Sequence, residues 1–504
     1  MYNVASGWLM TSLNPDPLVV ALVQVANSLP MFLFAIPAGA LVDSVDRRRF
    51  LALGESAITL TSAAFALLVS LHLMTPSRLL LFSFLAAVGS AITAPAWQAV
   101  VSQLVPKSDL PAAVAVNSVG INVSRAIGPA LGGLIVGLLG IAAPFWFDAF
   151  SNVGVIATLI WWRPPAVKSV QLNPEPFLSA MRTGIRHARY NPYLSSTLIR
   201  AAAFFLFASA YWAMLPLVAR DHIAGVPARF GPAVYGVLLA AIGASAVAGA
   251  FLLPRQRARL GADRVLLHAT LATAGATALF AVAHDLITAV VASLIAGASW
   301  IAGVSSLNVS AQVALPEWVR GRGLAMYVTV MFGALAAGSA IWGEVGVLAG
   351  VSASLLIAAA GAVAAIPLTS RWRVQTGAGV DFSPSMLWPA PITMHAVDDD
   401  RGPVLVTVEY HIDPKNREPF LRALAEYARE RPRDGAYDWG VFEDPAQEGR
   451  FVETFRSDSW LDHLRQHQRV TNADRVLQDA VWRFQIGDEP KTTHLVGAQT
   501  RDDS

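Results

Sequence analysis

Twelve apolar segments constrain this 504-residue chain more than any other feature. A helix needs about 20 mostly apolar residues to cross the hydrocarbon core of a bilayer. Read between prolines, glycines and charges, the segments cover approximately residues 1–13, 18–42, 51–74, 79–104, 115–138, 145–162, 196–219, 233–253, 265–283, 286–312, 324–342 and 347–369. The sequence therefore predicts an all-α membrane protein with 12 transmembrane helices.

The first segment is shorter than a bilayer span. Residues 1–13 lead directly into the turn-forming sequence Asn14-Pro15-Asp16-Pro17. We expect the first helix to be truncated, through an incomplete gene model or a late start codon. A short interfacial segment is the alternative.

Charge divides the chain into two parts. Only 14% of the residues are charged, whereas soluble domains carry about 25%, so an ordinary soluble enzyme is disfavoured. Residues 381–504 hold 15 of the 37 basic and 23 of the 35 acidic residues, a balance of −8 that leaves +10 for residues 1–380. The sequence predicts a membrane part followed by an acidic soluble domain. The small overall charge gives no indication of nucleic-acid binding, and the absence of cysteine excludes disulfides and thiolate metal sites.

Basic residues between the segments predict the orientation. With the first loop outside, 17 Lys and Arg residues fall in inner loops, and only Arg78, Arg220 and Arg229 fall in outer loops. The positive-inside rule therefore predicts a multi-pass membrane protein with its C-terminal domain in the cytoplasm.

The longest inner connection separates six segments from six others. Two six-helix halves joined by a cytosolic loop are the repeat arrangement of a secondary transporter. The expected parts are the N-terminal half (1–163), a central cytosolic loop (164–195), the C-terminal half (196–375), a linker (376–402), a soluble domain (403–490) and a tail (491–504).

A glycine followed by acidic and basic residues stands at the inner end of the second segment: Gly39, Asp43, Asp46, Arg47, Arg48 and Arg49. This pattern resembles the cytoplasmic loop motif of the major facilitator superfamily, although Ser44 replaces a usual basic residue and Asp46 a usual glycine. The resemblance implies a gating network of these charges against a helix N-terminus in the other half. Topology anchoring by the arginines is the alternative.

A second motif, Gly128, Pro129, Gly132 and Gly133, lies in the fifth segment. It resembles the core of the fifth-helix signature of major-facilitator antiporters, with Ala115 and Ser124 in place of the upstream glycines. The resemblance favours export over import. Close helix packing without a coupling role is the alternative.

Three further stretches, residues 95–106, 117–125 and 319–327, resemble the enterobactin-exporter-like branch of that superfamily, also called transmembrane secretion effectors. The similarity covers about residues 1–375. It implies a major facilitator fold, a place in the cell (inner) membrane, and efflux of a siderophore, drug or small metabolite.

Ionisable groups inside the segments are candidates for function, because charge is costly in a membrane. We expect Asp148 to accept the coupling proton or to pair with Arg125, and a structural hydrogen bond is the alternative. Glu55 is expected to reach the inner interface. Aromatic residues are candidates for apolar substrate contact, with packing as the alternative: Trp97, Phe204, Phe205, Phe207, Tyr211 and Trp212.

The tail sequence predicts a compact α+β domain. Alternation over 403–412, helical spacing over 414–431, two strands at 437–442 and 450–455, a second helical region over 459–480 with an interruption at 470–472, and a strand at 481–486 give the order β-α-β-β-α-β. This is the ferredoxin-like arrangement.

The stretch 451–467 resembles small dimeric domains related to antibiotic-biosynthesis monooxygenases. Members of that group oxidise aromatic polyketides, degrade haem or only dimerise, so a homodimer through this domain is one expected assembly. His463 and His467 are four residues apart on one helix face. A surface pair is the commoner explanation, and a ligand or metal site is the alternative. We expect no metal, no cofactor and no catalytic residues.

The leading hypothesis is a proton-coupled secondary transporter that expels a small molecule by alternating access within the lipid bilayer. Two hypotheses from other classes stay open: a membrane-anchored oxygenase and a ligand sensor, each acting through the C-terminal domain.

Overall fold

The computed structural model describes residues 1–42, 45–104, 131–162, 188–223, 230–316, 318–374 and 397–498, with positions 109, 120, 124, 127–128, 185–186, 381 and 385. By its internal contacts the chain forms two compact units. The first unit comprises Met1–Phe177, Ser196–Ala311 and Leu324–Thr376. The second comprises Leu178–Ser195, Gln312–Gly323 and Gly377–Ser504.

Long apolar helices build the first unit. Over the described residues they are α1 (Tyr2–Leu13), α2 (Pro17–Val42), α3 (Arg47–Ser70), α4 (Pro76–Leu104), α6 (Ala143–Trp161), α8 (Pro192–Leu217) with the π-helical turn η1 (Val218–His222), α9 (Gly231–Leu260), α10 (Ala262–Val282), α11 (Leu286–Val313), α12 (Arg320–Ala349) and α13 (Val351–Thr369).

The predicted membrane architecture is confirmed. Ten of the described helices are long and apolar enough to cross a membrane. Helix α1, with 12 residues, is shorter, as its sequence predicts. The expected fifth span is helical over residues 131–139, and most of its remaining residues lie outside the described part of the chain.

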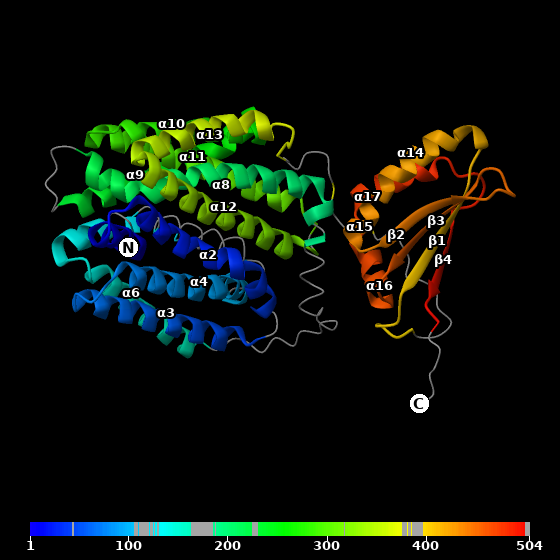
Figure 1. The fold of residues 1–504 in the computed structure, drawn as a ribbon. Helices are drawn as coiled ribbons and strands as arrows, with labels where there is room; N and C mark the ends of the chain where they lie inside the picture. The colour runs from blue at the N-terminus through cyan, green and yellow to red at the C-terminus, as the bar shows by residue number, and fades with distance from the viewer. Residues whose placement is uncertain are drawn as a thin grey trace. The chain divides into compact units, whose positions relative to one another are not determined.

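The helices form two groups. In Figure 1 the blue to cyan helices α2, α3, α4 and α6 gather on one side of this unit, and the green to yellow helices α8 to α13 gather on the other. In the first group α3 packs against α4 and α6, and α2 packs against α4. In the second group α10 packs against α13. These two groups are the N-terminal and C-terminal halves that the sequence predicts.

Small residues mediate the packing of the membrane helices. In α11, Ala289, Ala296 and Gly303 face inward, whereas Ile287 and Leu294 are exposed. Lipid tails are as apolar as leucine, so large side chains gain little by leaving them, and small side chains allow backbones to approach closely. These helices therefore pack through their small residues and leave large apolar side chains exposed.

The soluble domain is an α+β fold in the second unit. Its elements are β1 (Val404–His411), the 3₁₀ turn η3 (Pro414–Asn416), α14 (Arg417–Ala428), α15 (Glu430–Asp434), β2 (Tyr437–Glu443), β3 (Arg450–Ser457), α16 (Trp460–Arg469), α17 (Asn472–Trp482) and β4 (Lys491–Val496). The sheet order is β2-β3-β1-β4, with antiparallel neighbours throughout. This order and these directions match the predicted ferredoxin-like arrangement.

One face of the sheet carries the helices (Figure 1). Val404, Val406 and Val408 of β1 point into a core that also includes Phe420 of α14 and Val481 of α17. The second helical region breaks where the sequence predicts, because Thr471 caps α17. Its hydroxyl accepts from the backbone N–H of Asp474 in a capping box.

The predicted fourth strand was wrong. Residues 481–486 alternate in hydrophobicity, but α17 continues to Trp482 and Ile486 is 58% exposed. The fourth strand is β4, which falls in the segment assigned to the tail. Its side chains are mostly exposed because it is an edge strand, so its sequence lacks the apolar alternation by which a strand is predicted.

Candidate functional site

Asp148 forms a polar contact inside the N-terminal half. It lies on α6, and its carboxylate accepts a hydrogen bond of 2.6 Å from the hydroxyl of Ser62 on α3. Ser62 is fully buried. The expected partner Arg125 lies outside the described residues, so the pairing of these two charges stays a prediction. The Ser62 contact is the kind of structural hydrogen bond that the alternative interpretation requires.

Glu55 is buried, contrary to the expectation that it reaches an interface. Glu55 lies on α3 and is 8% exposed. Its carboxylate accepts a hydrogen bond of 2.8 Å from the indole N–H of Trp97 on α4. Trp97 also packs beside Leu51 and Leu159. These contacts make Trp97 a packing residue of the N-terminal half.

Asp46 and the three arginines of the predicted gating motif lie at the start of helix α3. Gly39 lies in α2, where its Cα faces open space, and Arg47 is the first residue of α3. Asp46 caps that helix by accepting from the backbone N–H of Arg49 at 3.1 Å. A carboxylate at this position favours the helix dipole. Asp43, the acidic residue central to the resemblance, lies outside the described residues.

Within the described part of the chain, the hydrogen bonds of Arg48 stay inside its own half. Its Nε donates to the carbonyl of Leu159 at 2.8 Å, and its Nη2 donates to the carbonyl of Ile160. Both acceptors are in the last turn of α6, where carbonyls lack helical partners. The guanidinium therefore joins the start of α3 to the end of α6 within one half.

The glycines of the second motif allow close backbone contact. A Cβ on Gly133 would lie 2.7 Å from the Cα of Gly236 and 2.9 Å from the carbonyl oxygen of Pro232, both on α9. A Cβ on Gly132 would lie 3.0 Å from the Cα of Met1, and one on Gly128 would lie 3.9 Å from the nitrogen of Met1. Pro129 lies outside the described residues.

Further contacts join the two halves at the same end of the bundle. Trp8 of α1 packs against Tyr235 of α9, with ring centroids 6.5 Å apart. The Arg220 guanidinium donates to the carbonyl of Thr11. A Cβ on Gly343 of α12 would lie 2.7 Å from the Cβ of Ala21 on α2. The described halves are thus in contact at the end that carries residues 14–16.

Aromatic side chains fill the interior of the C-terminal half. Phe204, Phe205 and Tyr211 are buried. Trp300 of α11 lies 5.5 Å from Phe205 and 5.4 Å from Trp212 between ring centroids. Phe207 packs against Trp342 of α12 at 5.7 Å.

Tyr211 and Trp212 place polar atoms among these rings. The hydroxyl of Tyr211 and the Nε1 of Trp212 are buried without a hydrogen bond of ordinary geometry among the described residues. A buried indole N–H usually has an acceptor. Trp212 and Trp300 therefore form a candidate contact for a ligand with an acceptor group, and Phe204 and Phe205 have packing roles.

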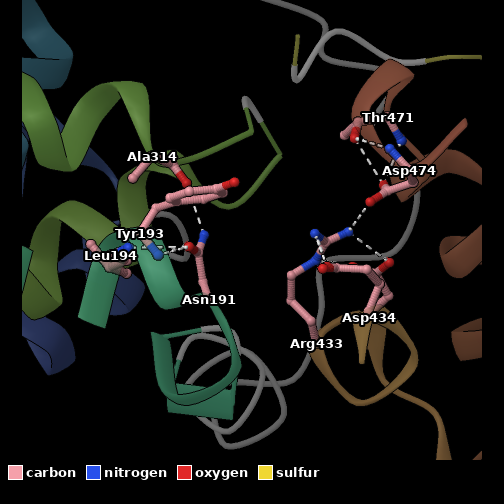
Figure 2. Close-up of polar contacts among 9 residues, drawn as sticks. Asn191, Tyr193, Leu194, Ala314, Arg433, Asp434, Thr471 and Asp474 are labelled. Atoms are coloured by element: carbon pink, nitrogen blue, oxygen red, sulfur yellow. Dashed lines mark hydrogen bonds and ion pairs between the residues drawn. The ribbon is translucent and has the colours of Figure 1, made fainter. Parts of the chain in front are cut away.

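Two tight polar contacts lie in the second unit (Figure 2). Asn191 caps α8, because its side-chain oxygen accepts from the backbone N–H groups of Tyr193 and Leu194 at 3.0 and 3.1 Å. Its Nδ2 donates to the carbonyl of Ala314 at 2.8 Å, which ties the start of α8 to the residue after α11.

In the soluble domain Arg433 donates to Asp434 at 3.0 Å and to Asp474 at 2.9 Å (Figure 2). Asp474 also accepts from the backbone N–H and the hydroxyl of Thr471 at 2.8 Å. Glu430 pairs with the same guanidinium. Burial raises the pKa of Glu430 above its usual value. The network joins α15 to the start of α17.

A second buried ion pair crosses the core of the domain. Arg431 donates to both carboxylate oxygens of Glu453 at 3.1 and 3.2 Å. Glu453 is fully buried and also accepts from Trp439 at 2.9 Å and from Tyr410 at 3.1 Å. The Arg431 guanidinium lies 4.4 Å from the ring centroid of Phe455. Both oxygens of the carboxylate are thereby satisfied.

The histidine pair is not a surface pair. His463 is 1% exposed, and its Nε2 lies 3.1 Å from the Nε2 of His467. His494 of β4 joins them, with one ligand atom from each of the three rings within 4.8 Å of the others. Burial, followed by repulsion from His467 and His494, lowers the pKa of His463 to about 3. Burial likewise lowers the pKa of His494.

Sequence reasoning missed His494 because it lies in the strand that was assigned to the tail. It also missed the buried acceptor Glu453, which lies between Phe451 and Phe455 on the inward face of β3. That alternation was a usable signal, since a carboxylate on an inward face requires a buried partner.

Comparison with known proteins places this architecture among transporters. The family model described as transmembrane secretion effector matches residues 1–502. The staphyloferrin A transporter of Staphylococcus aureus is 28% identical over 159 residues, which cover 31% of this chain and 40% of that protein. Macrolide efflux protein A of Streptococcus pyogenes is 23% identical over 220 residues, which cover 43% of this chain and 54% of that protein. The chain thus spans about half the length of these relatives.

The crystal structure of the nucleoside transporter NupG shares the fold. It superposes with a TM-score of 0.53 at 14% identity and covers 73% of this chain and 94% of its own. The resemblance of the soluble domain to monooxygenase-like dimeric domains stays a prediction.

Proposed function

The chain belongs to the transmembrane secretion effector family of the major facilitator superfamily, and on this premise we propose that it is a proton-coupled exporter of a small metabolite, siderophore or drug. In this proposal it is a transporter and not an enzyme. The two halves alternate access to a site between them, near the middle of the bilayer.

The observation that carries the proposal is the interface between the halves at one end of the bundle. Gly133 lies against Gly236, and Gly343 lies against Ala21, while the Trp8 ring packs against Tyr235 across the same interface. The contacts between small residues interlock little, which favours the reversible separation that alternating access requires. In the predicted orientation this is the outer end, so the proposal assigns the described state as closed to the outside.

The substrate class is proposed from two sources. One relative is a staphyloferrin A transporter and another is a macrolide efflux protein, so the proposed substrates are a siderophore or a drug. Trp212, beside the ring of Trp300, supplies a buried N–H that makes no hydrogen bond of ordinary geometry among the described residues. An apolar surface with a hydrogen-bond donor suits a ligand of that class.

Asp148 is the proposed proton acceptor. It is a carboxylate inside a membrane helix with a single hydroxyl donor, Ser62, among the described contacts of its carboxylate. Such residues commonly mark proton pathways in transporters. Protonation would retain a hydrogen bond with Ser62, because a hydroxyl both donates and accepts.

The test measures uptake into inverted membrane vesicles under an imposed proton gradient, with a radiolabelled macrolide and a catecholate siderophore as probes. We expect gradient-driven uptake of at least one probe and its loss, by tenfold or more, in Asp148→Asn. Asp285→Asn is the control, since that carboxylate lies exposed between α10 and α11 and bonds Thr288. Uptake that an uncoupler does not abolish, or full activity of Asp148→Asn, would refute proton coupling at this residue.

We further propose that the soluble domain lies in the cytoplasm and forms a homodimer. Support comes from apolar side chains left exposed on its strands, Phe442 at 61% and Leu495 at 52%. A dimer would cover part of this surface. Light scattering from the purified chain measures the assembly, and a monomeric mass at all concentrations would exclude it.

A further inference from the structure

Three histidine side chains from two distant parts of the soluble domain meet at one point. His463 and His467 are four residues apart on α16, so their side chains lie on the same face of the helix. His494 comes from β4, which pairs with the central strand β1 through His494 and Val406. One nitrogen from each ring lies within 4.8 Å of the other two.

The rings already approach the spacing of metal ligands. Metal–nitrogen bonds of 2.0–2.1 Å in tetrahedral geometry place two ligand nitrogens about 3.4 Å apart. The Nε2 atoms of His463 and His467 are 3.1 Å apart. His494 lies partly exposed on an edge strand, so rotation of its side chain can supply the remaining displacement.

His463 is enclosed by the other two imidazoles of the cluster. It is 1% exposed, and its ring centroid lies 4.7 Å from that of His467 and 4.8 Å from that of His494. The Nδ1 of His463 makes no hydrogen bond of ordinary geometry in the described structure. Imidazole nitrogens are common ligands of divalent transition metals.

The surroundings also give the cluster a wall and an opening. The ring of Trp460 lies 5.7 Å from His463 and 6.5 Å from His494 between centroids, which encloses one side. His467 and His494 are partly exposed, so the other side is accessible to solvent. This arrangement leaves a fourth coordination position for water or an exogenous ligand.

We propose that His463, His467 and His494 form a binding site for one divalent transition-metal ion, with Zn²⁺ as the reference ion. A bound ion would join α16 to the edge strand β4. This site is independent of the transport proposal, because none of its residues lies in the membrane helices.

The experiment uses the full chain, purified in detergent through an affinity tag without histidine and stripped with a chelator. Zn²⁺ affinity and stoichiometry are measured by competition with a chromogenic chelator, and Co²⁺ absorption reports the ligand geometry. The test variants are His467→Ala and His494→Ala, both at partly exposed positions that tolerate truncation. The matched control is His411→Ala, a histidine of the same domain whose side chain is 51% exposed.

The expected result is one equivalent of Zn²⁺ per chain and a visible Co²⁺ band for the wild type and for His411→Ala. Each test variant should lose affinity by about 100-fold or more and should lose the Co²⁺ band. Circular dichroism and gel filtration verify that the variants are folded. Absence of stoichiometric binding by the wild type would overturn the proposal. Wild-type affinity in either test variant would also overturn the three-ligand site.

Discussion

At the residue scale, the buried Arg, Asp and Glu side chains described in the soluble domain each contact a charge of opposite sign. Arg431 and Glu453 bind through two parallel hydrogen bonds, and Trp439 and Tyr410 also donate to the same carboxylate. A buried ion pair is weak evidence for stability as a whole, because desolvation offsets much of the attraction. Removal of one partner is costly, since the remaining charge is left buried without compensation.

We therefore predict that Arg431→Met destabilises the soluble domain by about 3–5 kcal/mol. Arg431→Met combined with Glu453→Leu should recover part of this loss, because no lone charge remains. Pulse proteolysis of the full chain in urea, read from cleavage within residues 403–498, measures the change.

The control for this prediction is Arg417→Met, which removes an exposed pair with Glu443. It should change the free energy of unfolding by less than about 1 kcal/mol. Equal effects of the two single variants would show that burial does not set the cost at Arg431.

At the element scale, membrane helices meet through glycine and alanine. Gly133 in the fifth span and Gly236 in α9 bring two backbones together across the two halves. Each additional carbon at such a contact must separate the helices, since neither backbone can yield. The motif that resembles an antiporter signature therefore has a concrete packing role at Gly133, and its proposed role in export rests on that resemblance.

Gly133→Leu should weaken the closed outer end. Overpacking costs typically about 1–3 kcal/mol, which shifts an equilibrium by roughly 5-fold to 150-fold. Because the chain contains no cysteine, spin labels can be introduced at single sites. Labels on Leu71, 56% exposed, and Ile287, 77% exposed, would report the separation of the halves by electron–electron resonance.

We expect longer label distances in Gly133→Leu than in the wild type. Gly137→Leu is the matched control, because nothing described lies within 4 Å of its Cβ position. If the label distances in Gly133→Leu coincide with those in the wild type and in Gly137→Leu, this contact does not hold the halves together.

At the scale of the whole molecule, one chain combines a helical membrane unit with a small α+β domain. The basic inner loops and the acidic C-terminal domain separate charge along the sequence, and the positive-inside rule converts this separation into an orientation. The assignment of the closed end to the outside depends on that orientation, since it holds only if residues 14–16 face outward.

We predict a cytoplasmic C-terminus. A green fluorescent protein fused after Ser504 should be fluorescent, and alkaline phosphatase at the same place should be inactive. The matched fusion after His284, between α10 and α11, should show the reverse pattern. Active phosphatase at Ser504 would contradict the predicted topology and the assignment of the closed end to the outside.

The sequence by itself determined the helices of the membrane unit and most elements of the soluble domain. Lipid offers no hydrogen bonds to a backbone, so each apolar run of sufficient length must become a helix. In the soluble domain, periodicities of two and of 3.6 residues identify β1, β2, β3 and the helices. Strand β4 was not predicted because an exposed edge strand carries no apolar alternation.

Only the tertiary structure decided which functional groups meet. Ser62 and Asp148 are 86 residues apart, Arg48 and Leu159 are 111 residues apart, and His494 joins His463 across a helix and a turn. Periodicity assigns a side chain to a face of its element. It contains no information about the partner across that face, because the partner depends on how whole elements pack.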